Sequence, residues 1–219
     1  MHEILTMKQE IIEKTEEYVK KKLQGEGTGH DWWHVHRVRT TALRLGKIEH
    51  ADLFIVELAA LLHDIADHKF HNGDEEIGPA TARNWLENLG VDNSTINRVC
   101  TIIRDVSFKG AEVETKIGTV EGKVVQDADR LDALGAIGIA RAFAYGGHKG
   151  RELYNPEIKP ENHTSFEAYK KSAGPTLNHF YEKLFLLKNR MNTLAGRKEA
   201  EKRHQFMKDF VDQFLSEWG

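Results

Sequence analysis

The sequence predicts an all-α, single-domain helical bundle, and three observations lead to this prediction. No segment keeps the alternation of apolar and polar residues expected of a β-strand over the length of a strand. Apolar residues recur instead at helical spacing in several segments. The 219 residues are enough to build a hydrophobic core. We expect one domain over residues 1–219.

The N-terminal half begins with two expected helices. Residues 3–23 place apolar side chains seven apart, with Glu and Lys between them, which predicts an amphipathic helix. Glycines at 25–29 interrupt it, and we interpret them as a connection because the Gly-Lys-Ser/Thr ending of a phosphate loop is absent. Asp31 is a suitable N-cap for a second helix that reaches about Gly46.

Residues 53–65 are apolar on nearly every face, which predicts a helix buried on all sides. Two further helices are expected after it. One is capped by Asp74 and ends at Leu89 before Gly90, and the next is capped by Ser94.

Small residues dominate the apolar face of residues 124–143, which predicts a closely packed helix. It would carry Asp127, Asp129 and Asp132. At least one of these carboxylates should point inward, where it needs a cation or a donor.

The C-terminal part is read as a loop followed by helices. Residues 146–163 are rich in Gly and Asn, and this loop is either an ordinary connection or a cover over a pocket. Residues 165–190 and 197–217 are expected to form amphipathic helices that serve packing.

Composition excludes some classes of partner. The formal net charge is -3 and there is no Lys/Arg-rich block, so general nucleic-acid binding is not expected, although a small anionic ligand needs only a local charge cluster. The single Cys100 excludes an internal disulfide, fits a reducing compartment and is expected to be buried. No signal peptide or apolar stretch near 18 residues is found, so we expect a cytoplasmic protein without a membrane partner, as a monomer or a homodimer.

The stretch from Leu61 to Lys69 combines an imidazole, carboxylates and charge at the end of the apolar run. A buried carboxylate at Asp64 beside His63 would need a compensating charge, and a divalent cation supplies one. Asp67 lies one turn further on, near such an ion without having to bind it. The alternative is a helix end with solvated polar side chains.

Three histidines lie close together at the start of the second helix. His30 and His34 are compatible with one metal shell that includes His63, whereas His36 would point about 200° away from His34. Trp32 and Trp33 are expected to be core and pocket wall rather than a nucleic-acid stacking platform, because no basic track accompanies them.

Three motifs occur in order along the chain: His34 within Trp-Trp-His-Val-His-Arg-Val, the pair His63-Asp64, and Asp129 within Ala-Asp-Arg-Leu-Asp-Ala. Together they resemble the signature of the HD-domain metal-dependent phosphohydrolases. The likeness covers about residues 25–145 and is similar to the small stand-alone bacterial members of that superfamily.

The resemblance implies one divalent ion, Mn²⁺, Co²⁺, Ni²⁺, Fe²⁺ or Mg²⁺, bound by His34, His63, Asp64 and Asp129; the donor set also suits Zn²⁺. Asp67 would orient the attacking water or shuttle its proton. The candidate substrate-binding residues are Arg37, His68, Lys69 and Lys109. For Lys69 and Lys109 a solvated surface lysine is the alternative.

The other acidic residues of the last motif, Asp127 and Asp132, are interpreted as supporting or structural. A ligand role for them would need a second metal. His68 and His71 do not follow the pattern that a two-metal site of this superfamily would show, which favours one ion.

The resemblance further implies hydrolysis of small nucleotides, first among them a nucleoside triphosphate cleaved to monophosphate and pyrophosphate. A 5′-nucleotidase, a cyclic-nucleotide phosphodiesterase and a guanosine tetraphosphate hydrolase are the alternatives within the enzyme class. A ligand sensor that keeps the metal without catalysis is the alternative outside it.

Overall fold

The computed structural model describes residues 2–25, 31–66, 76–106, 117–161 and 174–219. Within these ranges the regular structure is entirely helical and contains no β-strand, which confirms the predicted fold class. Contacts divide the chain into two compact units, Met1–Ser107 with Thr115–Ala128, and Phe108–Glu114 with Asp129–Gly219. The expectation of a single domain stays a prediction.

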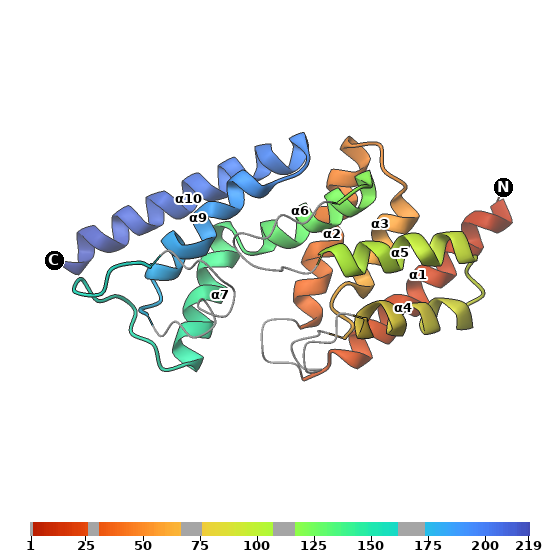
Figure 1. Cartoon of the computed structure of the whole chain (residues 1–219), viewed down its shortest axis with the longest axis horizontal. Coiled ribbons are helices and arrows are strands. Elements are labelled where there is room, and N and C mark those ends of the chain that lie inside the picture. The colour runs from red at the N-terminus through yellow and green to blue at the C-terminus, as the bar shows by residue number, and fades with distance from the viewer. Residues whose placement is uncertain (1, 26–30, 67–75, 107–116, 162–173) are drawn as a thin grey trace. The chain divides into compact units, whose positions relative to one another are not determined.

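The first unit is arranged around α3 (Figure 1). This helix packs against α1, α2 and α5, and α4 packs against α5. Seven of its ten residues are buried, which confirms the prediction of a helix surrounded by protein. The helices of this unit are α1 (His2–Lys22), α2 (Trp32–Ile48), α3 (Leu53–Leu62), α4 (Ile77–Asn88), α5 (Asn93–Val106) and α6 (Val120–Asp132), whose last residues continue into the second unit.

Most expected helix boundaries are confirmed. The Asp31 carboxylate accepts a hydrogen bond from the backbone N–H of His34 at 2.9 Å and caps α2. Gly90 follows α4 with a φ of 72°, the left-handed conformation that glycine adopts at little cost. The expected cap Asp74 lies outside the described residues.

The expected cap of α5 was wrong by two residues. Asp92 precedes the helix, and its carboxylate accepts hydrogen bonds from the backbone N–H and the hydroxyl of Thr95 at 3.0 and 2.7 Å. Ser94 lies inside α5. Two good capping residues so close together cannot be ranked from the sequence, and the second bond to the Thr95 hydroxyl favours Asp92.

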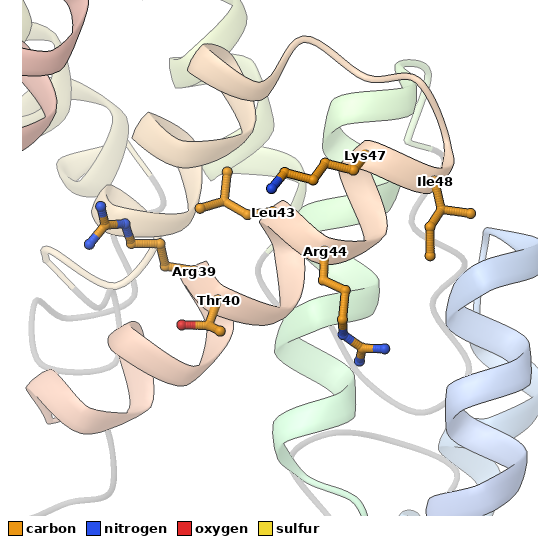
Figure 2. A pocket seen from close by; sticks show the side chains of 6 residues that line it. All are labelled: Arg39, Thr40, Leu43, Arg44, Lys47 and Ile48. Carbon is orange, nitrogen blue, oxygen red and sulfur yellow. The ribbon is translucent and has the colours of Figure 1, made fainter.

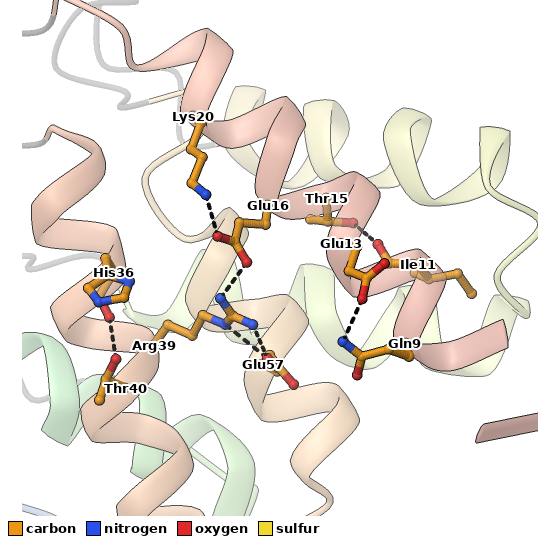
Figure 3. A network of polar contacts seen from close by, with 10 residues as sticks. All are labelled: Gln9, Ile11, Glu13, Thr15, Glu16, Lys20, His36, Arg39, Thr40 and Glu57. Atoms are coloured by element: carbon orange, nitrogen blue, oxygen red, sulfur yellow. Dashed lines mark hydrogen bonds and ion pairs between the residues drawn. The ribbon is translucent and has the colours of Figure 1, made fainter. Parts of the chain in front are cut away.

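Arg39 joins three helices of the first unit (Figure 3). Its guanidinium donates to Glu16 of α1 at 2.7 Å and to Glu57 of α3 at 2.8 Å, and Lys20 adds a second positive charge beside Glu16. Burial alone would raise the pKa of Glu16, but the hydrogen bonds and charges of Lys20 and Arg39 outweigh it, and the net pKa lies below its usual value. The network therefore holds α1, α2 and α3 together.

The expected single helix over residues 124–143 is in fact two helices. α6 ends at Asp132, and α7 (Gly135–His148) begins after a short turn. Gly135 has a φ of 73°, and the guanidinium of Arg203 donates to the Leu131 carbonyl at 2.7 Å. The same carbonyl also accepts the Leu134 N–H at 3.0 Å in a tighter turn, and the left-handed Gly135 follows, so the helix ends where the sequence alone showed only packing glycines.

The second unit contains α7, a π-helical turn η2 (Phe180–Leu184), α9 (Phe185–Leu187), a 3₁₀ turn η3 (Lys188–Arg190) and α10 (Leu194–Trp218). α7 packs against α10, and the ring of Phe143 lies about 6 Å from the rings of Phe180, Phe210 and Phe214. The last expected helix is confirmed as α10, with Met207 and Val211 buried. In the described part of the expected helix 165–190, residues 178–190 are helical without interruption and pass from the π-helical turn through α9 to the 3₁₀ turn.

Candidate metal centre

His34 reaches the interior because α2 presents one turn of its N-terminal end to the core. It is the third residue of the helix, and its side chain is buried, with 1% of its surface exposed. The Asp31 cap fixes the backbone at this turn. The position of His34 is thus set by a residue three positions before it.

His63 and Asp64 follow directly after α3. The sequence predicted a helix up to residue 65, but α3 ends at Leu62. A tighter turn follows, in which the Ile65 N–H donates to the Leu62 carbonyl at 3.2 Å. His63 keeps a helical backbone, with a φ of −59° and a ψ of −33°, and the Asp64 carboxylate lies 3.4 Å from the Nε2 of His63.

The distances define a compact group of donors. The Nε2 atoms of His34 and His63 lie 3.3 Å apart, and Asp64 Oδ2 lies 3.3 Å from the first and 3.4 Å from the second. Ligand atoms of His34, His63 and Asp129 all lie within 4.8 Å of one another. The structure thus brings together three of the four expected ligands in one group, while the fourth, Asp64, contacts both imidazoles.

The tautomer of His63 follows from a backbone contact. Its Nδ1 lies 2.9 Å from the carbonyl oxygen of Ala60, and only an N–H can donate to a carbonyl. Nδ1 therefore carries a proton, and Nε2 is the nitrogen that faces His34 and Asp64. The Ala60 carbonyl was not foreseen, because a backbone group leaves no mark in the sequence beyond its spacing.

This arrangement fits a divalent transition-metal ion. Two nitrogens that each bind an ion at about 2.1 Å are separated by about 3 to 3.5 Å, and the two Nε2 atoms have that separation. Two imidazoles with carboxylates are a donor set that such ions accept. The separation of the two Nε2 atoms and the chemistry of the donor set therefore both suit such an ion.

The acidic residues of α6 divide by environment. Asp129 is partly buried and belongs to the donor group. Asp132 is buried and pairs with Arg141 at 2.7 Å, and Asp127 is fully buried. The ion pair gives Asp132 a partner within its own unit, which agrees with the structural role expected for it.

The remaining expected residues are only partly described. Arg37 lies on α2, partly exposed, three residues after His34. The other candidates and the two further histidines considered as ligands lie outside the described residues: Asp67, His68, Lys69, Lys109, His30 and His71. Their roles stay predictions.

The two tryptophans differ from expectation. Trp33 is 62% exposed, so the prediction that it belongs to the core was wrong. Trp32 is partly buried and lies below Lys20, whose Nζ is 4.7 Å from its ring centroid. His36 is exposed and contacts both indoles, which agrees with its expected direction away from His34.

An open cavity of about 530 Å³ lies along α2 but is separate from the donor group (Figure 2). Leu43 stands in the middle of its lining and is nine residues after His34, hence about 13 Å along the helix and on its opposite side. The cavity is lined by Arg39, Thr40, Leu43, Arg44, Lys47 and Ile48. It contributes no side chain to the candidate metal centre.

The fold and the donor group define an all-helical protein with a His/Asp centre, and comparison identifies its family. The HD domain family matches residues 32–134. The uncharacterized protein YpgQ of Bacillus subtilis is 42% identical over 202 residues, 92% of this chain and 90% of that protein. The chain belongs to the HD-domain family.

Solved structures agree with this assignment. An HD-superfamily hydrolase from Bacillus thuringiensis has 48% sequence identity and a TM-score of 0.77, with 96% of this chain and 98% of that chain covered. Bacillus subtilis YpgQ in complex with ADP has 38% identity and a TM-score of 0.71, covering 94% and 97% of the two chains. The chain thus has the fold of HD-superfamily hydrolases. Within the described ranges, no helix is both long and apolar enough to cross a membrane.

Proposed function

We propose that the protein is a divalent-metal-dependent phosphohydrolase that acts on small nucleotides, converting a nucleoside triphosphate to its monophosphate and pyrophosphate. The observation that carries this proposal is the donor group, in which two imidazole Nε2 atoms lie 3.3 Å apart beside Asp64 and Asp129. The ADP bound to the related YpgQ supports a nucleotide as ligand.

The proposed metal ligands are His34, His63, Asp64 and Asp129. A divalent ion held by them would polarise a phosphate oxygen and lower the pKa of a water molecule. The Nδ1–H of His63 donates to Ala60, so Nε2 is the nitrogen that would bind the ion. The Asp31 cap holds the backbone of His34 in the first turn of α2, which supports its role as a ligand.

The other steps of hydrolysis are assigned to residues around the donor group. Asp67 would orient the attacking water or accept its proton, the role that the resemblance to the HD-domain phosphohydrolases implies for it. Negative charge that spreads over the phosphate oxygens needs positive partners. The proposed partners are Arg37, His68, Lys69 and Lys109.

The proposal is tested by a hydrolysis screen. Metal-stripped protein is reloaded with Mn²⁺, Co²⁺, Ni²⁺ or Mg²⁺ and offered mono-, di- and triphosphates, cyclic nucleotides and guanosine tetraphosphate, and the products are resolved by chromatography. Monophosphate plus pyrophosphate from triphosphates is the expected result. Free phosphate from monophosphates would replace it with a nucleotidase, and stoichiometric metal without turnover of any substrate would contradict an enzymatic role.

A further inference from the structure

Trp33 is a large aromatic side chain that the fold leaves open next to a buried metal-ligand candidate. It is 62% exposed, whereas the adjacent His34 is 1% exposed. A single exposed apolar side chain needs no explanation on most of a protein surface. The exposure of Trp33 does need an explanation, because the next residue along the chain is His34, a proposed metal ligand.

The indole of Trp33 is held in place although it is exposed. The ring of His36 stands edge to face against it, with centroids 5.9 Å apart and an interplanar angle of 84°. His36 also contacts Trp32, at 5.8 Å, and Lys20 lies over Trp32. A ring supported at one side and open elsewhere loses little conformational freedom when a planar ligand stacks on it.

The register of α2 places Trp33 on the side of the helix that also carries Arg37. Relative to His34, Trp33 is offset by about 100° and Arg37 by about 60° in the same direction around the helix. Trp33 and Arg37 are four residues apart and therefore neighbours on the helix surface. From the metal ligand outward, the order is thus imidazole, guanidinium and indole.

We propose that Trp33 is the stacking platform for the base of the nucleotide. This inference rests on the proposed function, because it assumes that the phosphates of the nucleotide bind beside His34 and Arg37. Every nucleobase has a π face, so stacking on an indole binds nucleosides without selecting among bases. The platform would therefore distinguish nucleotides from base-free phosphates and tolerate purines and pyrimidines.

The test compares a ligand that has a base with one that lacks it. Binding of adenosine diphosphate and of inorganic pyrophosphate to the metal-loaded protein is measured by titration calorimetry for wild type, Trp33→Ala and Trp33→Phe. Trp218→Ala is the matched control, since Trp218 is 46% exposed at the end of α10. Circular dichroism verifies that each variant is folded.

Trp33→Ala should weaken adenosine diphosphate binding by roughly tenfold or more, as expected for the loss of one stacked base. Trp33→Phe should fall between the two, which also provides the test if the alanine variant does not fold. Pyrophosphate binding should not change, and Trp218→Ala should behave as wild type. Three results would each overturn the platform. Trp33→Ala could lose affinity equally for adenosine diphosphate and pyrophosphate, or keep its affinity for adenosine diphosphate. The wild-type protein could also bind adenosine diphosphate no more tightly than pyrophosphate.

The two proposals fail in different ways. If no nucleotide is hydrolysed but Trp33→Ala still loses affinity for adenosine diphosphate alone, the hydrolase is wrong and the platform stands. If triphosphates are hydrolysed with the same KM and kcat by wild type and Trp33→Ala, the platform is wrong and the hydrolase stands. Loss of the platform should raise KM more than it lowers kcat, because the base is bound equally in the ground state and the transition state.

Discussion

The Nε2 atoms of His34 and His63 face each other at 3.3 Å although the two residues are 29 positions apart and belong to different helical segments. Asp31 caps the helix that carries the first ring, and Ala60 accepts the Nδ1 proton of the second. A local contact therefore orients the ring of His63, and another fixes the backbone that carries His34. The centre is assembled from two pieces of backbone that are already shaped for it.

Replacing a proposed ligand should remove the metal. His63→Ala and Asp64→Ala are expected to weaken binding of Mn²⁺ or Co²⁺ by more than about a hundredfold, because even partners outside the coordination sphere cost up to about that much. Metal content after gel filtration, by elemental analysis, measures the effect. His50→Asn is the control, since His50 is exposed and its φ of 55° suits asparagine. A ligand variant that retains stoichiometric metal would contradict the assignment.

Asp67→Ala should separate binding from turnover. If Asp67 handles the proton of the attacking water, the variant keeps its metal but loses roughly a hundredfold to ten-thousandfold in kcat. Metal content and steady-state kinetics are measured on the same preparation. Full activity in Asp67→Ala would exclude this role, and loss of the metal would make Asp67 a ligand instead.

Arg39→Met should destabilise the first unit. The substitution keeps much of the apolar stem but leaves the carboxylates of Glu16 and Glu57 without their shared partner. We expect a loss of about 1 to 2 kcal/mol in the free energy of unfolding. The network is partly exposed to solvent, so it should contribute less to stability than a fully buried network. Urea unfolding measures it. Arg83→Met, which removes an exposed ion pair with Glu87 and an exposed hydrogen bond to Asn97, should change stability by less, about 0.5 kcal/mol.

Acid should destabilise the protein in part through His179. Burial lowers the pKa of this imidazole to about 3, and the charges of Lys183 and Arg151 add to the effect. In the unfolded chain His179 binds a proton with a pKa near 6.5, whereas in the folded protein its pKa is about 3. The contribution of this difference to stability is therefore fully present above about pH 6.5 and decreases as the pH falls toward about 3.

Thermal unfolding of metal-stripped protein between pH 4 and pH 8 tests this prediction. His179→Asn should reduce the pH dependence by up to one proton, about 1.4 kcal/mol per pH unit in the free energy of unfolding. His50→Asn, at an exposed position, is the control variant. Parallel curves for wild type and His179→Asn would show that His179 is protonated in the folded protein.

The sequence allowed the helical fold, the buried helix α3 and the N-cap of α2 to be predicted, because each depends on residues close together in the chain. The end of α3 at Leu62 could not be foreseen, since no Gly or Pro marks it and a side-chain bond from His63 to Ala60 supports the turn. The break after α6 lies where Leu134 is extended and Gly135 is left-handed, and Arg203, more than 60 residues away, donates to Leu131 there. The exposure of Trp33 likewise depends on which surfaces other helices cover.

Because of the break at Gly135, the directions in which the side chains of α7 point around their helix axis do not follow from those of α6. In one continuous rod, each inserted or deleted residue would turn everything beyond it by about 100°. Here the left-handed glycine and the Arg203 contact with Leu131 end the rod just after Asp129. An insertion or deletion within α7 can therefore be accommodated at the break, and the direction in which Asp129 points around the α6 axis does not change.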